Sequence, residues 1–291
     1  MKKKFYYYIY IGILAIIMFA CQHEDIIPLD EETGTVSYTI KLDNPVQGRA
    51  IGDGSYIDEL VVGVFQIRDN KLKQIGQFTF PVENGTATIN IPLLKKDTYD
   101  FVFWAHTKEN GVYNIDDLSK IIVNYDAFEK TQAESIALDA FYAVRKNVTV
   151  ETPGSASITL NRPFTQVSFG VCGNNDKVDK IKTAEIQISG LYTKFCPLNN
   201  SEIIKENVSE PYVFKFKDLT DKDNTFMIDG KTYTHLTTHY FLAPIQGADQ
   251  KISGSGKLMD ENNAIVSEFT FEDVPLLSNM RVNVGKIMNV D

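Results

Sequence analysis

Runs of alternating apolar and polar residues, separated by turn residues, dominate the sequence from Val36 onward. In the run at 36–42 every second side chain is apolar, and the four that share one face are Val36, Tyr38, Ile40 and Leu42. A period of two is typical of a β-strand that buries one face, whereas an amphipathic helix repeats about every 3.6 residues. Because such runs are short and frequent, they predict an all-β protein whose strands pack as a sandwich rather than as an α/β sheet.

Similar strand-like runs continue through the chain. They lie at 59–67, 78–91 and 97–107 in the first half, and near 157–173, 181–194, 211–217, 224–243, 250–258, 264–272 and 280–290 in the second half. The pair Asn84-Gly85 between two such arms predicts a tight hairpin turn. The run 97–107 is apolar on both faces, so we predict that Trp104 lies in the core of the first domain. The stretch 115–143 is where we expect helical turns, because much of it is rich in helix formers.

The length and composition of the chain allow one large domain or two ordinary ones. The chain has 291 residues, and its apolar content of 43% supports packed cores rather than disorder. The segment "ETPGSAS" at 151–157 combines Pro, Gly and small polar residues between two strand-rich halves, which is typical of a linker. We therefore expect an N-terminal β-sandwich domain at 50–152 and a C-terminal one at 153–291.

The start of the chain has the pattern of an export signal. Lysines at 2–4 precede the uncharged apolar stretch 5–20, which is marginal as a membrane span because a span needs about 20 apolar residues. Cys21 follows directly, and the whole segment resembles a bacterial lipoprotein signal. That resemblance implies a signal peptide at 1–20 and a lipid on Cys21. A cleaved secretory signal and an uncleaved anchor remain as alternatives.

Two acidic residues follow shortly after Cys21. The segment Gln22-His23-Glu24-Asp25 resembles the tag by which Bacteroides-type bacteria send lipoproteins to the outer cell surface. This resemblance implies a surface-exposed lipoprotein of the cell outer membrane. A solvated linker is the plainer interpretation of the same four residues.

The net charge argues against a nucleic-acid partner, and the cysteine content leaves open whether a disulfide forms. A net charge of −9 provides no electrostatic basis for binding nucleic acid, so we expect no nucleic-acid partner. With Cys21 lipidated, Cys172 and Cys196 remain, and an exported compartment would let them form a disulfide. Two buried free thiols are the alternative. The chain has no Cys-x-x-Cys pair and no zinc-binding spacing.

Catalytic and metal-binding motifs are scarce. His235 and His239 stand four positions apart in a β-branched, aromatic stretch, where a strand would separate them by about 13 Å, too far to share one metal ion. We expect them to be half-exposed strand histidines. The segment 254–256 lacks the Gly-x-Ser-x-Gly spacing of a nucleophile motif and predicts a bend in a strand. We therefore expect no enzyme activity, no cofactor and no metal.

Three segments resemble fimbrillin-like proteins, which are the lipoprotein-derived subunits of type V pili on Bacteroides-type bacteria. The segment "LNRPFTQVSFGV" at 160–171 is similar to the opening strand of the family's second domain. The segment "YFLAPIQG" at 240–247 is similar to the strand and Pro-containing loop before the family's last strands. In "VQGRAIG" at 46–52, Arg49-Ala50 has the context of the family's arginine-specific processing site. Together with the lipoprotein-like start, the resemblance covers essentially the whole chain.

This resemblance implies a fold and a route of assembly. The fold would be two tandem transthyretin-like β-sandwich domains. The subunit would travel as a lipoprotein and would lose the strand Val36–Leu42, part of the segment 21–49, after cleavage between Arg49 and Ala50. It would then join other pilus subunits by donor-strand exchange and contribute to adhesion through a host or bacterial surface receptor. Its location would be the outer membrane, through the lipid on Cys21, and the fimbrium after processing.

One departure from the family bears on the type of subunit. Stalk subunits carry a C-terminal strand extension as the donor, whereas here an apparent closing strand occupies 280–290, which favours a tip or accessory subunit. Whether 280–290 is the last strand of the sandwich or the donor itself stays open at this point. Two other functions also remain. One is a surface glycan-binding lipoprotein, which needs exposed aromatic faces, and the other is a membrane-retained pilus anchor that is not cleaved at Arg49.

Overall fold

Strands dominate the part of the chain that the structure describes, and the predicted all-β sandwich fold is confirmed. The computed structural model describes residues 33–43, 54–108, 111–125, 138–150, 155–204, 211–216, 224–243 and 250–289. The strands of the N-terminal half are β1 (Thr33–Leu42), β2 (Glu59–Arg68), β3 (Lys71–Pro81), β4 (Thr86–Leu94), β5 (Thr98–His106), β6 (Tyr113–Asn114), β7 (Ile121–Val123), β8 (Ala140–Thr149) and β9 (Ser155–Leu160).

The C-terminal half has the same character, with one short helix, α2 (Asn175–Lys180). Its strands are β10 (Phe164–Gly173), β11 (Thr183–Ser189), β12 (Lys194–Cys196), β13 (Glu202–Ile204), β14 (Tyr212–Phe216), β15 (Thr225–Ile228), β16 (Lys231–Leu242), β17 (Lys251–Met259), β18 (Ile265–Pro275) and β19 (Arg281–Met288). Strand β19 confirms the closing strand that was predicted within 280–290.

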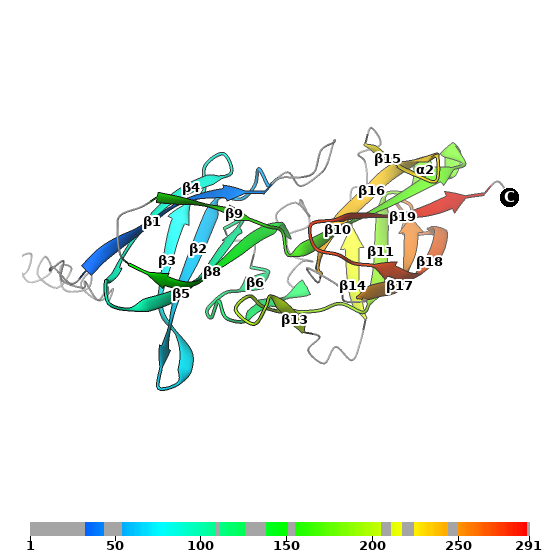
Figure 1. The fold of residues 1–291 in the computed structure, drawn as a ribbon. Coiled ribbons are helices and arrows are strands. Elements are labelled where there is room, and N and C mark those ends of the chain that lie inside the picture. The colour runs from blue at the N-terminus through cyan, green and yellow to red at the C-terminus, as the bar shows by residue number, and fades with distance from the viewer. Residues whose placement is uncertain are drawn as a thin grey trace, which may run out of the picture.

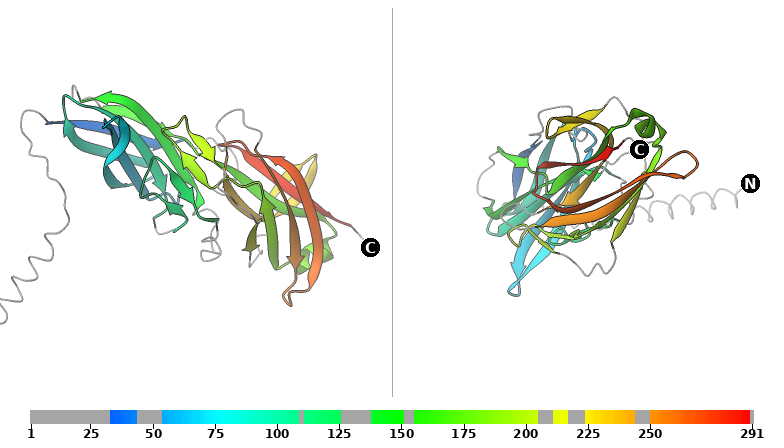
Figure 2. Two further views of the ribbon diagram at one scale, coloured as in Figure 1. Left: turned by 90° about the horizontal axis from the view of Figure 1, so that it is seen from below. Right: turned by 90° about the vertical axis from the view of Figure 1, so that its right-hand side faces the viewer.

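Two pairs of sheets repeat one strand order. In the N-terminal pair, the sheet β4-β1-β9 packs on the sheet β3-β2-β5-β8. In the C-terminal pair, the sheet β15-β16-β10-β19 packs on the sheet β14-β11-β17-β18. In each pair the first strand, β1 or β10, lies between an antiparallel partner, β4 or β16, and a parallel final strand, β9 or β19. The two pairs follow one another along the length of the molecule (Figure 1, Figure 2).

Strand β9 belongs with the first pair of sheets, although the expected boundary at 152/153 places it in the second domain. Residues 155–160 pair in parallel with Ser37–Leu42 of β1, and the side chains of Ile158 and Leu160 are buried in the N-terminal core. The turn-forming residues before β9 therefore mark the loop that leads into the last strand of the first sheet pair. The remainder of the proposed division into 50–152 and 153–291, and its transthyretin-like type, stay predictions.

A further small sheet, β13-β12-β7-β6, joins the two halves of the chain. Strand β7 of the N-terminal half pairs with β12 of the C-terminal half, with Ile121 opposite Phe195. Next to this sheet lies the ring of Trp104, which is fully buried, so the prediction that it is a core residue is confirmed. However, the face of β5 that carries Trp104 belongs to the hydrophobic cluster that continues into the C-terminal half, and not to the interior of the first sandwich.

The expectation of helical turns at 115–143 is only partly met by the residues described there. Tyr125 and Leu138 have 3₁₀-helical conformation, whereas Ile121–Val123 forms β7 and Ala140 begins β8. Residues 126–137 lie outside the described residues. Strand β7 is only three residues long, so periodicity could not identify it, and its pairing with a segment distant in the sequence determines its conformation.

Two turn predictions are confirmed. Asn84 and Gly85 both have left-handed backbone angles, with φ of 51° and 71°, as the two central residues of a type I′ turn require. Glu83 and Thr86 pair across this turn as an isolated bridge, but β3 and β4 belong to different sheets, so the tight turn is present without a hairpin of paired strands. The register of β17 against β18 shifts between Ile252 and Gly254, so the strand is irregular where the bend was expected. A Cβ atom on Gly254 would lie 2.0 Å from the carbonyl oxygen of Gln187, which explains the need for glycine there.

Candidate assembly site around strand β1

Strand β1 is the central strand of its sheet and is hydrogen-bonded along both sides. It pairs antiparallel with β4 from Thr33 to Lys41 and in parallel with β9 from Ser37 to Leu42. At its end, the backbone N–H of Leu42 donates to the carbonyl oxygen of Gly85 at 3.0 Å, and that of Asp43 donates to the carbonyl oxygen of Leu160 at 2.8 Å. Removing β1 would therefore leave a groove between β4 and β9 with unpaired backbone groups on both walls.

The inward face of β1 is apolar, as the alternation at 36–42 predicts. Val36 and Tyr38 are each 8% exposed and Ile40 is 1% exposed, while Leu42 is half-buried against the same core. Burying each such side chain contributes about 1.5–3 kcal/mol, so the three buried ones together contribute roughly 5–9 kcal/mol. This sum is comparable with the whole stability of an ordinary domain, and β1 would not leave spontaneously.

Tyr38 occupies the centre of this face. Its ring meets those of Phe101 and Phe103 edge-on, at centroid distances of 6.0 and 5.7 Å and interplanar angles of 79° and 90°. This edge-to-face geometry is one that aromatic pairs prefer. Burial raises the pKa of the Tyr38 hydroxyl, an effect that the charge of Arg145 partly opposes, so the phenol is neutral at physiological pH.

The outward face of β1 helps to set its register on β4. Ser37 stands opposite Asn90, and the Ser37 hydroxyl donates a hydrogen bond of 2.7 Å to the amide oxygen of Asn90. Because side chains alternate between faces, a slip by one residue would turn the apolar residues outward and lose this bond.

A buried ion pair lies beyond the end of β9, where the chain passes into the C-terminal half. The guanidinium of Arg162 donates from Nε and Nη2 to the two carboxylate oxygens of Asp139, each at 2.6 Å, and both side chains are 1% exposed. The guanidinium also lies 4.7 Å from the ring centroid of Phe141 and 5.8 Å from that of Tyr240. Burial by itself lowers the pKa of Arg162, but the hydrogen bonds and charge of Asp139 raise it by more, so Arg162 stays charged.

The sequence pointed to one partner of this ion pair but not to the other. Arg162 belongs to the segment "LNRPFTQVSFGV" that carries the family resemblance, whereas nothing in the sequence near Asp139 distinguishes it from the many acidic residues of the chain. The two residues are 23 positions apart, so no local spacing signals the contact.

The two cysteines of the described residues lie in different sheets. Cys172 is on β10 and Cys196 is on β12, both are half-buried, and no disulfide joins them. Cys21, Arg49 and Ala50 lie outside the described residues.

The histidines of β16 are more deeply buried than expected. His235 is 6% exposed and His239 is fully buried, so the expectation of half-exposed side chains is wrong. The ring of His239 lies 4.4 Å from that of Phe214 and stacks on that of Phe241 at 4.5 Å, while its Nδ1 donates to the carbonyl oxygen of Tyr240 at 3.1 Å. In the part of the chain that the structure describes, no group of three His, Cys, Asp or Glu side chains could hold a metal ion.

The buried imidazole of His239 predicts a stability that depends on pH. Burial lowers the pKa of His239 from 6.5 to about 3 in the folded protein. Between these values the unfolded chain binds a proton that the folded protein does not, so the stabilisation is complete above pH ~6.5 and is lost as the pH falls. We expect this group to lower the free energy of unfolding by about 1.4 kcal/mol for each pH unit below ~6.5. Urea denaturation at several pH values measures it, and His239→Leu should reduce the slope. An equal slope in both proteins would contradict the assignment.

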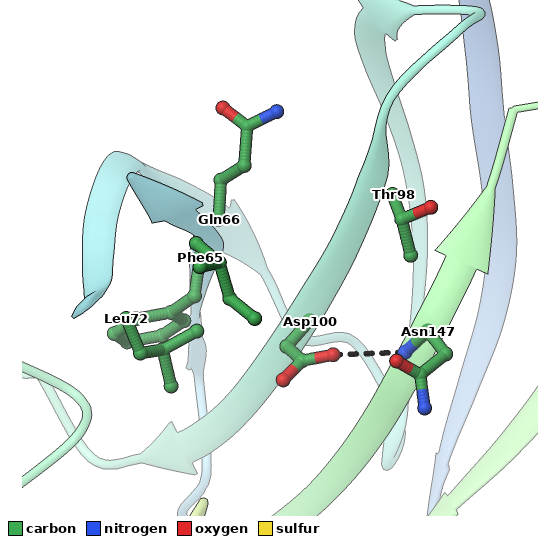
Figure 3. Close-up of a pocket in the computed structure, with 7 residues that line it drawn as sticks. Phe65, Gln66, Leu72, Thr98, Asp100 and Asn147 are labelled. Atoms are coloured by element: carbon green, nitrogen blue, oxygen red, sulfur yellow. Dashed lines mark hydrogen bonds between the residues drawn. The ribbon is translucent and has the colours of Figure 1, made fainter. Parts of the chain in front are cut away.

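A shallow hollow lies between the β2–β3 hairpin and strands β5 and β8. It has a volume of about 250 Å³, and Figure 3 shows the residues that line it. The carboxylate of Asp100 accepts a hydrogen bond of 2.8 Å from the backbone N–H of Asn147 and is thus engaged in holding β8. The one ring in its lining, that of Phe65, is only 1% exposed. The hollow therefore lacks the open aromatic face on which a sugar would stack.

Solved structures of adhesion and fimbrial proteins are similar to this chain. A candidate cell adhesion protein from Bacteroides uniformis matches with a TM-score of 0.52 at 9% identity, over 88% of this chain and 92% of that chain. A fimbrial assembly protein from Parabacteroides distasonis has a TM-score of 0.40 at 11% identity, over 86% and 90% of the two chains. The tip fimbrial protein Mfa3 from Porphyromonas gingivalis, with a C-terminal truncation, has a TM-score of 0.37 at 13% identity, over 82% and 81%. Such identities concern the fold alone, and at that level the fimbrillin-like resemblance is confirmed.

The class defined by this fold is thus an all-β sandwich protein that resembles fimbrillin-like proteins in fold. The chain belongs to a family of unknown function, DUF6562, whose sequence model matches residues 29–288. No curated protein matches the sequence. No helix among the described residues is both long and apolar enough to cross a membrane.

Proposed function

We propose that this protein is a fimbrillin-like pilus subunit of tip or accessory type that contributes to adhesion at the cell surface. It is exported as a lipoprotein with lipid on Cys21, is activated by cleavage after Arg49, and is assembled with other pilus subunits by donor-strand exchange. The observation that carries the proposal is the position of β1, which fills the space between β4 and β9 and precedes Arg49 in the chain. The fold shared with a candidate cell adhesion protein supports a role at the cell surface.

The packing of β19 supports the interpretation that this strand is not a donor. This strand pairs with β10 from Arg281 to Met288, and the side chains of Val284 and Met288 are buried in the C-terminal core. Donating β19 to a neighbour would expose these side chains, so the strand serves its own sandwich. The subunit then accepts a strand from a neighbour at the β1 groove without offering β19 in return.

The two alternative functions differ from this proposal in testable ways. A pilus anchor would keep both its lipid and its uncleaved β1. A surface glycan-binding lipoprotein would need exposed rings. Among the aromatic side chains of the described residues, Tyr56 is the exposed one, at 44%. A single exposed ring is a small platform for a polysaccharide, and this observation favours the pilus subunit.

Replacement of Arg49 by alanine should block assembly. Without the cut, β1 remains covalently attached, and its return to the groove outcompetes a strand from another subunit because it stays at a high effective concentration. We expect full-length protein in the outer membrane fraction and none in filaments sheared from the cells, as measured by immunoblotting. The matched control is Arg68→Ala, which changes an exposed arginine at the end of β2 and should leave the filaments unchanged.

The two halves of the proposal can be separated in the same strains. Labelling with a fatty acid should mark the uncut precursor of the wild type and Arg49→Ala but not Cys21→Ser. Arg49→Ala protein in sheared filaments at the wild-type level would refute assembly by cleavage. Equal labelling of Cys21→Ser and the wild type would refute the lipid anchor and leave the assembly mechanism untouched.

A further inference from the structure

The position of Gly34 in β1 has no room for a side chain. A Cβ atom added there would lie 2.7 Å from Cγ1 of Val150 and 3.2 Å from Cγ of Lys95. Carbon atoms in favourable contact stand about 3.5–4.0 Å apart. Lys95 can move its flexible chain, but Val150 is 5% exposed and is packed in the N-terminal core. This end of the groove therefore accepts glycine in preference to any larger residue.

The position of Tyr38, two inward side chains further along, has the opposite requirement. The rings of Phe101 and Phe103 are fully buried and lie 6.0 Å from each other. Both rings form T-shaped contacts with the ring of Tyr38. A strand with a small side chain at this position would leave a cavity in the core, and one with a polar side chain would bury an unsatisfied group.

Together these two positions allow only one register for a strand in the groove. A slip by two residues in one direction would push the side chain at the place of Val36 into the space beside Gly34. A slip by two in the other direction would put that same side chain against Phe101 and Phe103 and would displace the ring of Tyr38. A slip by one would turn the residues at the outward positions inward.

We propose that the strand that replaces β1 carries glycine at the place of Gly34 and an aromatic residue four positions later, and that it is not β19 of a second copy. Aliphatic residues would fill the other inward positions. This inference rests on the proposed function, because it requires that β1 leaves the groove. It adds the identity of the partner in chemical terms, since the groove selects a donor whose inward face has the pattern Gly, aliphatic, aromatic, aliphatic.

A second copy of this chain would be a poor donor through β19. The two faces of that strand present either Val282, Val284, Lys286 and Met288 or Arg281, Asn283, Gly285 and Ile287. The first face has no glycine and would bury the charge of Lys286. On the second face, aligning Gly285 with the place of Gly34 would put the amide of Asn289 against the two phenylalanine rings. The groove thus excludes assembly of this protein with itself through β19.

Peptide exchange tests both the opening of the groove and its selectivity. The full chain is cut at Arg49 by an arginine-specific protease, exposed briefly to urea to release β1, and diluted into an excess of fluorescein-labelled peptide. The peptides are residues 33–43, the same peptide with Gly34→Leu, Tyr38→Ala or Thr39→Ala, and residues 279–291. Captured peptide is measured by native gel fluorescence and by competition in fluorescence anisotropy. The Arg49→Ala variant, treated in the same way, is the uncut control.

We expect the cut protein to capture the 33–43 peptide and the uncut control to capture none. Tyr38→Ala should bind at least about 100-fold more weakly and Gly34→Leu at least about 10-fold more weakly. Thr39→Ala, which changes an outward side chain, should bind within about 3-fold of the unmodified peptide. The 279–291 peptide should not be captured.

The outcomes separate the inference from the function on which it rests. If the cut protein captures no peptide at all, including 33–43, the groove does not open and the proposed function is contradicted. If it captures 33–43, Gly34→Leu, Tyr38→Ala and 279–291 alike, the groove opens without selecting its donor, and the inference is overturned while the proposed function stands.

Discussion

Replacing Arg162 by alanine is expected to lower the free energy of unfolding by about 3–5 kcal/mol. In the folded protein, two hydrogen bonds of 2.6 Å join Arg162 to Asp139, and both side chains are 1% exposed. The alanine variant leaves the carboxylate of Asp139 buried without the cation that compensates its charge. Because native proteins are stable by about 5–15 kcal/mol, such a loss is a large fraction of the total and should be evident in urea denaturation.

Two further variants test the physical origin of this loss. Lys120→Ala removes an exposed partner of Asp117, with Nζ–Oδ2 at 3.6 Å and the two side chains 56% and 40% exposed, and should cost less than about 1 kcal/mol. The double variant Arg162→Met with Asp139→Leu removes both buried charges and should recover much of the lost stability. If Arg162→Ala unfolded at the wild-type urea concentration, the buried ion pair would contribute nothing to the fold.

Replacing Trp104 by alanine is expected to cost about 3–5 kcal/mol as well, through a cavity where the two halves of the chain meet. Trp104 is fully buried, and its ring lies 5.3 Å from that of Tyr113, 6.2 Å from that of Phe195 and 6.3 Å from that of Phe164. Two of these three rings belong to the C-terminal half, so the cavity should destabilise both halves together. Circular dichroism is the appropriate measurement, because the substitution removes the only tryptophan fluorophore.

The conservative variant Trp104→Phe separates packing from hydrogen bonding. The indole Nε1 of Trp104 has no hydrogen-bond partner among the residues that the structure describes, so its removal breaks no bond there. We expect Trp104→Phe to cost less than about 3 kcal/mol because a ring still fills part of the space. A Trp104→Ala protein that unfolded like the wild type but lost a bound glycan would contradict the packing role and would favour the glycan-binding alternative.

Local patterns in the sequence determined much of the secondary structure. The alternation at 36–42 predicted β1 and the burial of its inward side chains, and Asn84-Gly85 predicted the tight turn between β3 and β4. These predictions succeeded because side-chain alternation and turn geometry are set by neighbouring residues. Within 115–143, where helical turns were expected, Ile121–Val123 is a strand for the complementary reason, since a three-residue strand owes its conformation to its partner β12 and not to its own composition.

Membership of a sheet and the partners of buried charges could be learned only from the tertiary structure. The sequence predicts that the segment 155–160 is a strand that follows a linker. Only its parallel pairing shows that it is the edge strand of the first sheet, next to β1. Asp139 looks like any acid until the fold brings Arg162 to it. For β1 the two kinds of information meet. The sequence by itself determined that residues 36–42 form a strand with one apolar face, because alternation is a local property. That this strand lies in the middle of its sheet, in a groove that excludes a side chain at Gly34 and receives a ring at Tyr38, was decided by contacts with β4, β5, β9 and Val150, which are distant in the sequence.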